Sequence, residues 1–210
     1  MKALYIIGAG GFGREVFSWA EHHPDCGKRW AICGFYDDNL EALNRFDYPV
    51  GVVGKVSEAE ASDACCYVLA IGDSLVRRRI GRELLDAGCE LQTLIHPTVT
   101  LGRNVQLGRG VLLCPQVTLT CDIELGDGVV MNAHSSIGHD VKVADWCSLM
   151  GHCELNGGCV LEEAVYMGTG SRMIPGRRAG AEAFIGAGSV VLQSVPAGAR
   201  VFGNPARRIR

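Results

Sequence analysis

The chain has 210 residues, 48% hydrophobic and 20% charged, which excludes a disordered or fibrous protein. Its formal net charge of -3 provides no global positive field, which argues against nucleic acid as a partner. No apolar run approaches the roughly 18 residues of a membrane span. The 10 scattered cysteines follow no secretory signal and show no C-x-x-C spacing, so we expect reduced thiols and a cytoplasmic protein.

The first predicted elements are a buried strand, a glycine-rich turn and a helix, in the stretch KALYIIGAGGFGREVFSWAEHH. Gly8, Gly10 and Gly13 have the G-x-G-x-x-G spacing of dinucleotide-binding turns, and Gly11 lies inside the turn. Such a turn lets a phosphate approach the backbone N–H groups at a helix N-terminus. The stretch therefore predicts a site for a nucleotide or sugar nucleotide, although a turn that merely packs a helix on a sheet has the same spacing.

A second predicted strand, WAICGFYDD, ends in Asp37 and Asp38, some 24 residues beyond Gly13. An acidic residue at this distance can bind a ribose hydroxyl, so both are candidate substrate-binding residues.

A third predicted strand, YVLAIGD, leads into a helix with Val76, Ile80 and Leu84 on one face. Only about 94 residues precede the repeat that follows, about half of a full dinucleotide domain. This short length argues against a hydride-transfer enzyme.

The second half of the chain repeats with a period of six residues. Apolar side chains recur without interruption at Ile95, Leu101, Leu107, Leu113, Leu119, Leu125, Met131, Ile137, Val143, Leu149, Leu155, Leu161, Met167, Met173, Ala179, Ile185 and Val191. This pattern predicts a hexapeptide β-helix and excludes an α-helix, whose period differs. Three units make a coil of eighteen residues, and successive coils stack at about 4.8 Å.

Small or β-branched residues four positions after each apolar residue are expected to point inward as well. Cys147, Cys153 and Cys159 occupy this position, so we interpret them as core residues rather than metal ligands. Arg177 also falls on an inward position, and we expect a distorted corner there. Glycines directly follow many of the apolar residues, and we expect them where the backbone turns sharply: Gly102, Gly108, Gly126, Gly138, Gly168, Gly180 and Gly186.

The whole chain resembles the two-domain sugar acyltransferases grouped with sialic acid O-acetyltransferases. Their relatives include nucleotide-amino-sugar N-acetyltransferases that make bacillosamine and perosamine derivatives. The similarity is carried by the motifs IIGAGGFGRE, GFYDD, AIGDSLVRRRI, LIHPTV, IGHD, IGAGSVV and VFGNPARRI, in this order and spacing.

The resemblance implies an α/β Rossmann-like domain at 1–94 that holds a nucleotide sugar. It implies an all-β left-handed parallel β-helix at 95–210. It further implies a homotrimer with acetyl-CoA in the groove between neighbouring β-helices, and no metal.

The resemblance implies that His139 is the general base and that Asp140 orients or polarises it. Acyl transfer needs such a pair, because the attacking amine or hydroxyl must lose a proton and imidazole titrates near working pH. A histidine at an exposed corner is otherwise usually just solvated. Gly157, eighteen residues on, is expected one coil away, and the resemblance assigns its N–H to the thioester oxygen. Asn132 matches a residue that lines the sugar pocket.

Further residues match positions near CoA in the family, where small side chains admit the pantetheine arm: Gly168, Thr169, Gly186 and Ala187. The basic end, Arg207, Arg208 and Arg210, either meets CoA phosphates or is a solvated tail. Some relatives have a second histidine nine residues after the base, where this chain has Ser148. His134 and His152 are expected to stack one coil apart, without a third ligand for a metal.

The expected activity is acetyl transfer from acetyl-CoA to the amino group of a nucleotide-linked 4-amino-dideoxy sugar, in surface glycan biosynthesis. O-acetylation of a sugar such as sialic acid is the enzymatic alternative, and the glycine turn with its trailing acids favours the nucleotide-bearing acceptor. A non-catalytic trimeric scaffold or nucleotide-sensing module is the alternative of another class. The His139–Asp140 pair argues against it.

Overall fold

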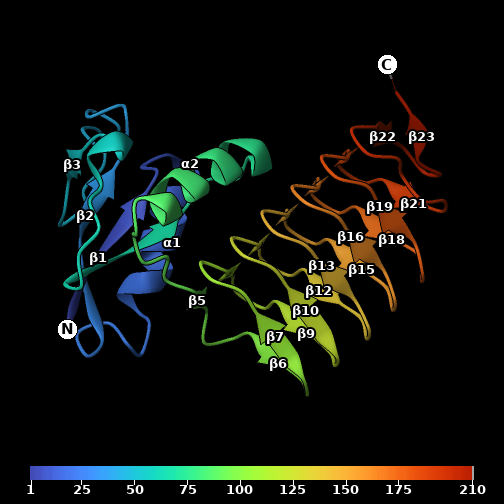
Figure 1. The fold of residues 1–210 in the computed structure, drawn as a ribbon, viewed down its shortest axis with the longest axis horizontal. Helices are drawn as coiled ribbons and strands as arrows, with labels where there is room; N and C mark the ends of the chain where they lie inside the picture. Colours follow the sequence, from blue (N-terminus) through green and yellow to red (C-terminus); the bar gives the residue numbers. More distant parts are fainter. Residues whose placement is uncertain (210) are drawn as a thin grey trace.

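The computed structural model describes residues 1–209, which form a small α/β unit packed against a long stack of β-coils (Figure 1). The α/β unit has a parallel sheet of order β3-β2-β1-β4, with β1 at Lys2–Ile7, β2 at Trp30–Tyr36, β3 at Val52–Gly54 and β4 at Cys65–Leu69. Helices α1 (Gly11–Glu21) and α2 (Ser74–Asp86) and the short helix η1 (Val56–Glu58) complete it. None of the helices in 1–209 is long and apolar enough to cross a membrane.

The predicted third strand and its helix are present as β4 and α2, but the buried face of α2 differs from the expectation. Ile80 and Leu84 are buried, whereas Val76 is 40% exposed. Arg77 is fully buried in its place. The helix is therefore rotated toward a polar contact that hydropathy alone does not reveal.

The β-coils form three sheets, here called the first, second and third faces, whose strands are parallel except for the last one. The first face has β5 (Leu94–Ile95), β8 (Leu112–Leu113), β11 (Val130–Met131), β14 (Ser148–Leu149), β17 (Tyr166–Met167), β20 (Phe184–Ile185), β22 (Arg200–Phe202) and β23 (Arg207–Arg208). The second has β6 (Thr100–Leu101), β9 (Thr118–Leu119), β12 (Ser136–Ile137), β15 (Glu154–Leu155), β18 (Arg172–Met173) and β21 (Val190–Val191). The third has β7 (Val105–Leu107), β10 (Ile123–Leu125), β13 (Lys142–Val143), β16 (Val160–Leu161) and β19 (Arg178–Ala179).

The ladder confirms the predicted eighteen-residue coil, since Leu113 pairs with Met131 and Met131 with Leu149. The last coil is shorter, because Ile185 pairs with Val201. Arg177 does not distort its own corner, since Ala179, two residues later, pairs with Leu161 at the regular spacing of eighteen residues. The irregularity comes one coil later.

The inward side chains form one continuous core, in which Cys147, Cys153 and Cys159 are fully buried, as predicted. Burial raises the pKa of the Cys147 thiol to about 12. The first coil is different: Leu101 is 43% exposed, because no coil lies beneath it to cover its side chain.

The glycines that follow the apolar residues are not the turning points, contrary to the expectation. Positive φ angles occur two residues later, for example at Asn104 (57°) and Asp140 (58°). The glycines are needed for stacking instead: a Cβ on Gly168 would lie 2.6 Å from the backbone nitrogen of Ala187 on the next coil. The corners that contain such a glycine thus combine a missing side chain, which lets the next coil approach, with a separate left-handed residue.

The α/β unit packs on the first face of the β-coils, and its core includes Leu112 and Val130 from that face. Trp146, 2% exposed, closes the junction at the corner between the third and first faces. Its indole occupies the space beside Gly81 of α2, so closely that a Cβ on that glycine would collide with the ring. This packing holds the two parts together.

Candidate active site

His139 and Asp140 form a hydrogen-bonded pair at the corner between the second and third faces. The corner joins β12 to β13, and Asp140 is its left-handed residue. His139 Nδ1 lies 2.7 Å from Asp140 Oδ2, and both side chains are about two-thirds exposed. A carboxylate only accepts, so Nδ1 carries the donated proton and Nε2 keeps its lone pair. Nε2 is therefore free to act as a base toward a ligand in solvent.

Gly157 lies directly against the imidazole on the next coil, as the eighteen-residue period predicts. A Cβ on Gly157 would lie 2.5 Å from His139 Nε2 and 2.6 Å from Cε1. The N–H of Gly158 donates to the carbonyl oxygen of His139 at 2.8 Å and fixes the two coils. Within residues 1–209 the Gly157 N–H forms no hydrogen bond. A base and a free amide donor thus adjoin one surface, the arrangement that acyl transfer uses.

We expect Asp140→Asn to lower the rate of acetyl transfer by about 10- to 100-fold, because an amide no longer stabilises the imidazolium. Asparagine tolerates the left-handed backbone, so the corner is retained. Steady-state kinetics and thermal unfolding of the variant test this expectation. Unchanged turnover would show that Asp140 only shapes the corner.

Asn132 and the small residues predicted to contact CoA lie at a different corner, between the first and second faces. Asn132, Gly168 and Gly186 belong to one column at steps of eighteen, with Thr169 and Ala187 beside it. In a single chain the second face separates this column from His139 and Gly157. Gly186 is also covered by the ring of Phe202, so its missing side chain serves packing within the chain.

The glycine turn of the α/β unit has the features of a phosphate site. Gly8 has a φ of 100°, and Gly13 is so close to Gly8 that no side chain fits between helix and turn. Gly10 has open space around it, and α1 begins at Gly11 without a capping side chain. The N–H groups of the first helical turn therefore remain available for an anion.

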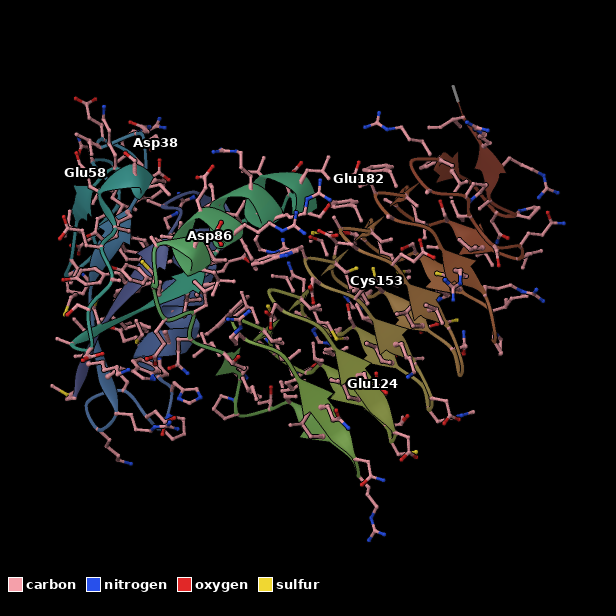
Figure 2. All side chains as sticks on the ribbon, in the orientation of Figure 1. Asp38, Glu58, Asp86, Glu124, Cys153 and Glu182 are labelled. Atoms are coloured by element: carbon pink, nitrogen blue, oxygen red, sulfur yellow. The ribbon has the colours of Figure 1, made fainter. Side chains whose placement is uncertain are left out.

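Of the two predicted acids, only Asp37 joins the glycine turn. Its Oδ2 accepts a hydrogen bond of 2.7 Å from the N–H of Ala9. Asp38 instead accepts from the N–H of Val56 at 3.3 Å and lies near Glu58 at the edge of the unit (Figure 2). The structure therefore brings together the glycines and Asp37 but leaves Asp38 apart.

Other residues singled out in the sequence take part in ring stacking or strand pairing. The rings of His134 and His152 are parallel, with centroids 4.8 Å apart, and no three metal-ligating side chains cluster anywhere in 1–209. Arg207 and Arg208 are not a loose tail, since they form β23 antiparallel to β22. Arg210 lies outside the described residues.

The sequence did not predict the burial of two polar residues at the junction. Ser148, in the position of the second histidine of some relatives, is buried and donates to the carbonyl of Gly72 at 2.8 Å. Arg77 is buried beside it, although it belongs to a run of three consecutive arginines, a pattern typical of a solvent-exposed helix face. Neither residue carries a signal in the sequence, because their partners are distant in the chain.

Residues 3–84 match the family model described as the PglD N-terminal domain. PerB from Caulobacter crescentus, in complex with CoA and GDP-perosamine, is 29% identical with a TM-score of 0.86, covering 100% of this chain and 98% of its own. The acetyltransferase domain of PglB from Neisseria gonorrhoeae, in complex with acetyl coenzyme A, is 26% identical with a TM-score of 0.89, covering 99% of each chain.

WeeI from Acinetobacter baumannii is 28% identical with a TM-score of 0.87, covering 100% of both chains. No curated protein matches the sequence significantly. A PglD-type domain, full-length structural similarity and a hexapeptide β-helix with a His–Asp corner agree with one another. Over its full length the chain is thus similar to sugar acetyltransferases with a hexapeptide-repeat β-helix, and its residues 3–84 match the PglD N-terminal domain.

Proposed function

We propose that this protein transfers the acetyl group of acetyl-CoA to the amino group of a nucleotide-linked 4-amino-dideoxy sugar, in surface glycan biosynthesis. The observation that carries the proposal is the free Nε2 of His139 against the Gly157 amide, in a chain that also has a nucleotide-type turn. Its similarity over the full length to PerB, which binds CoA and GDP-perosamine, supports the same acceptor class. The ten free cysteines fit a reducing compartment, and we place the reaction in the cytoplasm.

The reaction follows from the two groups at the corner. The sugar amine attacks the thioester carbonyl carbon while His139 Nε2 takes its proton, and Asp140 stabilises the resulting imidazolium. The Gly157 N–H donates to the carbonyl oxygen as it becomes negative. Cleavage of the carbon–sulfur bond then yields the amide, and the departing CoA thiolate recovers the proton from the imidazolium.

We further propose that the complete site forms between copies of the chain in a homotrimer. The α/β unit covers the first face, for example through Ser74, which donates to the Ala164 carbonyl at 2.9 Å. In a triangular coil the corner that carries His139 is opposite that face. The nucleotide turn and the base therefore face different sides of one chain, and a neighbouring copy can bring them together. Sedimentation analysis at assay concentrations tests the trimer directly.

The acceptor class is tested with acetyl-CoA and a panel of UDP-, GDP- and dTDP-linked 4-amino sugars together with free sialic acid. Mass spectrometry of the products follows the gain of one acetyl group, and mild alkali distinguishes an amide from a labile ester. We expect an alkali-stable product on a nucleotide-linked amino sugar. An alkali-labile product on sialic acid alone would identify an O-acetyltransferase, and no product on any acceptor would favour a scaffold.

A further inference from the structure

Arg77 of α2 is a fully buried cation, and within residues 1–209 its side chain donates all its hydrogen bonds to backbone carbonyls. Its Nη1 donates to Ile71 at 2.6 Å and to Gly72 at 3.3 Å, both in the loop after β4. Its remaining donors reach the β-coils, each at 2.9 Å: Nε to the carbonyl of Gly128, and Nη2 to those of Trp146 and Cys147. Arginine has five N–H donors, and all five are used.

The loop that Arg77 holds adjoins the nucleotide turn. It leaves the carboxyl end of β4, the same edge of the sheet at which Gly8 and Asp37 lie. A Cβ on Gly8 would lie 3.0 Å from the Ala70 carbonyl oxygen, so the turn rests on this loop. The loop in turn is bound to the β-coils by Ser148, which donates to the Gly72 carbonyl at 2.8 Å.

The carbonyls that Arg77 binds in the β-coils belong to two successive coils, at the corner between the third and first faces. Trp146 lies six residues after Asp140, with strand β13 between them. The same guanidinium therefore contacts the loop beneath the nucleotide turn and the coil that continues from the His139 corner. Because Arg77 is buried, the carbonyls of Ile71, Gly128 and Trp146 would have no hydrogen-bond partner within residues 1–209 without it, in a site that water does not reach. The carbonyls of Gly72 and Cys147 would keep their bonds from Ser148 and Val130.

We propose that Arg77 is a positioning residue for acetyl transfer, which sets the place of the nucleotide turn on the β-coils. This role rests on the proposed function, since it concerns where the bound sugar nucleotide is presented. Small displacements of a substrate from its reacting group reduce rates by as much as about 100-fold. Lysine at this position offers three donors on a flexible stem, and methionine offers none. Neither can bind both the loop after β4 and the β-coils as arginine does.

The test compares Arg77→Lys and Arg77→Met with Arg79→Met as the matched control. Arg79 is on the same helix, but its side chain is 63% exposed and pairs only with Glu83, at 3.3 Å. For the folded Arg77 variants at a temperature below their unfolding transitions, we expect kcat/KM for the nucleotide-linked acceptor to fall about tenfold or more. The KM for acetyl-CoA should stay within about twofold and Arg79→Met should match the wild type.

A purely structural role would give a different result: a lower melting temperature with unchanged kcat/KM per folded enzyme, which would overturn the proposal. Arg77→Lys provides the measurement if the methionine variant does not fold.

Hydrogen–deuterium exchange of residues 70–76 and 146–148 gives a readout that is independent of activity. Faster exchange in both segments of the Arg77 variants, with β1 unaffected, is the expected result. Unchanged exchange would contradict the role of Arg77 in joining the two segments. If the wild type acetylates no nucleotide sugar, the proposed function fails while the exchange data still decide whether Arg77 joins the two segments.

Discussion

Replacing His139 with alanine is expected to lower kcat for acetyl transfer by about 100- to 10,000-fold, the range that a general base contributes. The variant retains the Gly157 amide and the surface around it, so substrate binding should change much less than turnover. The residual rate should rise with pH, because the free amine becomes available without a protein base. Initial rates for wild type and variant across neutral to alkaline pH measure both effects.

The fold is expected to survive this substitution, because the His139 side chain is 67% exposed and bonds only to its neighbour Asp140. Matching thermal unfolding curves for wild type and variant provide the control. A variant that folds normally and keeps wild-type turnover would remove His139 as the base and leave the similarity to the sugar acetyltransferases unaffected.

Replacing Gly157 with alanine keeps the backbone N–H but should lower kcat by about 100-fold, because it displaces the base from its position. The added methyl group occupies the place of the imidazole, so His139 must swing away from the amide beside it. The backbone φ of Gly157 is not positive, and alanine adopts it without strain. The defect should therefore appear in turnover rather than in the melting temperature.

Gly51→Ala is the matched control for this substitution, because Gly51 lies in the α/β unit with no atom within 4 Å of an added Cβ. It should behave as the wild type in both assays. Equal activity of Gly157→Ala and Gly51→Ala would show that the contact between the ring and Gly157 has no part in the reaction.

The periodic part of the fold could be predicted from the sequence because each coil contacts only the coils next to it. Counting by eighteen placed Gly157 against His139 without any knowledge of side-chain geometry. The same count failed at the ends, where Leu101 has no coil beneath it and the last coil is shortened. An end has no repeating neighbour, so periodicity alone does not fix it.

Arg77 and Asp38 show which parts of a site a local pattern does not predict. The acceptors of Arg77 in the β-coils lie 51, 69 and 70 residues away, so the burial of its charge depends on tertiary structure. Asp38 fits the spacing for ribose binding as well as Asp37 does. Its hydrogen bond to Val56 turns it to another part of the unit, and spacing contains no such information.

The central claim is that the nucleotide turn and the His139 corner serve one reaction. Comparing kcat/KM for a nucleotide-linked 4-amino sugar with that for the same amino sugar without its nucleotide, at equal acetyl-CoA, tests this most directly. Binding energy from the remote nucleotide should raise kcat/KM at least about 100-fold, with one alkali-stable acetyl group in the product. Equal values for the two acceptors, or no amide product from the nucleotide-linked sugar, would contradict the account.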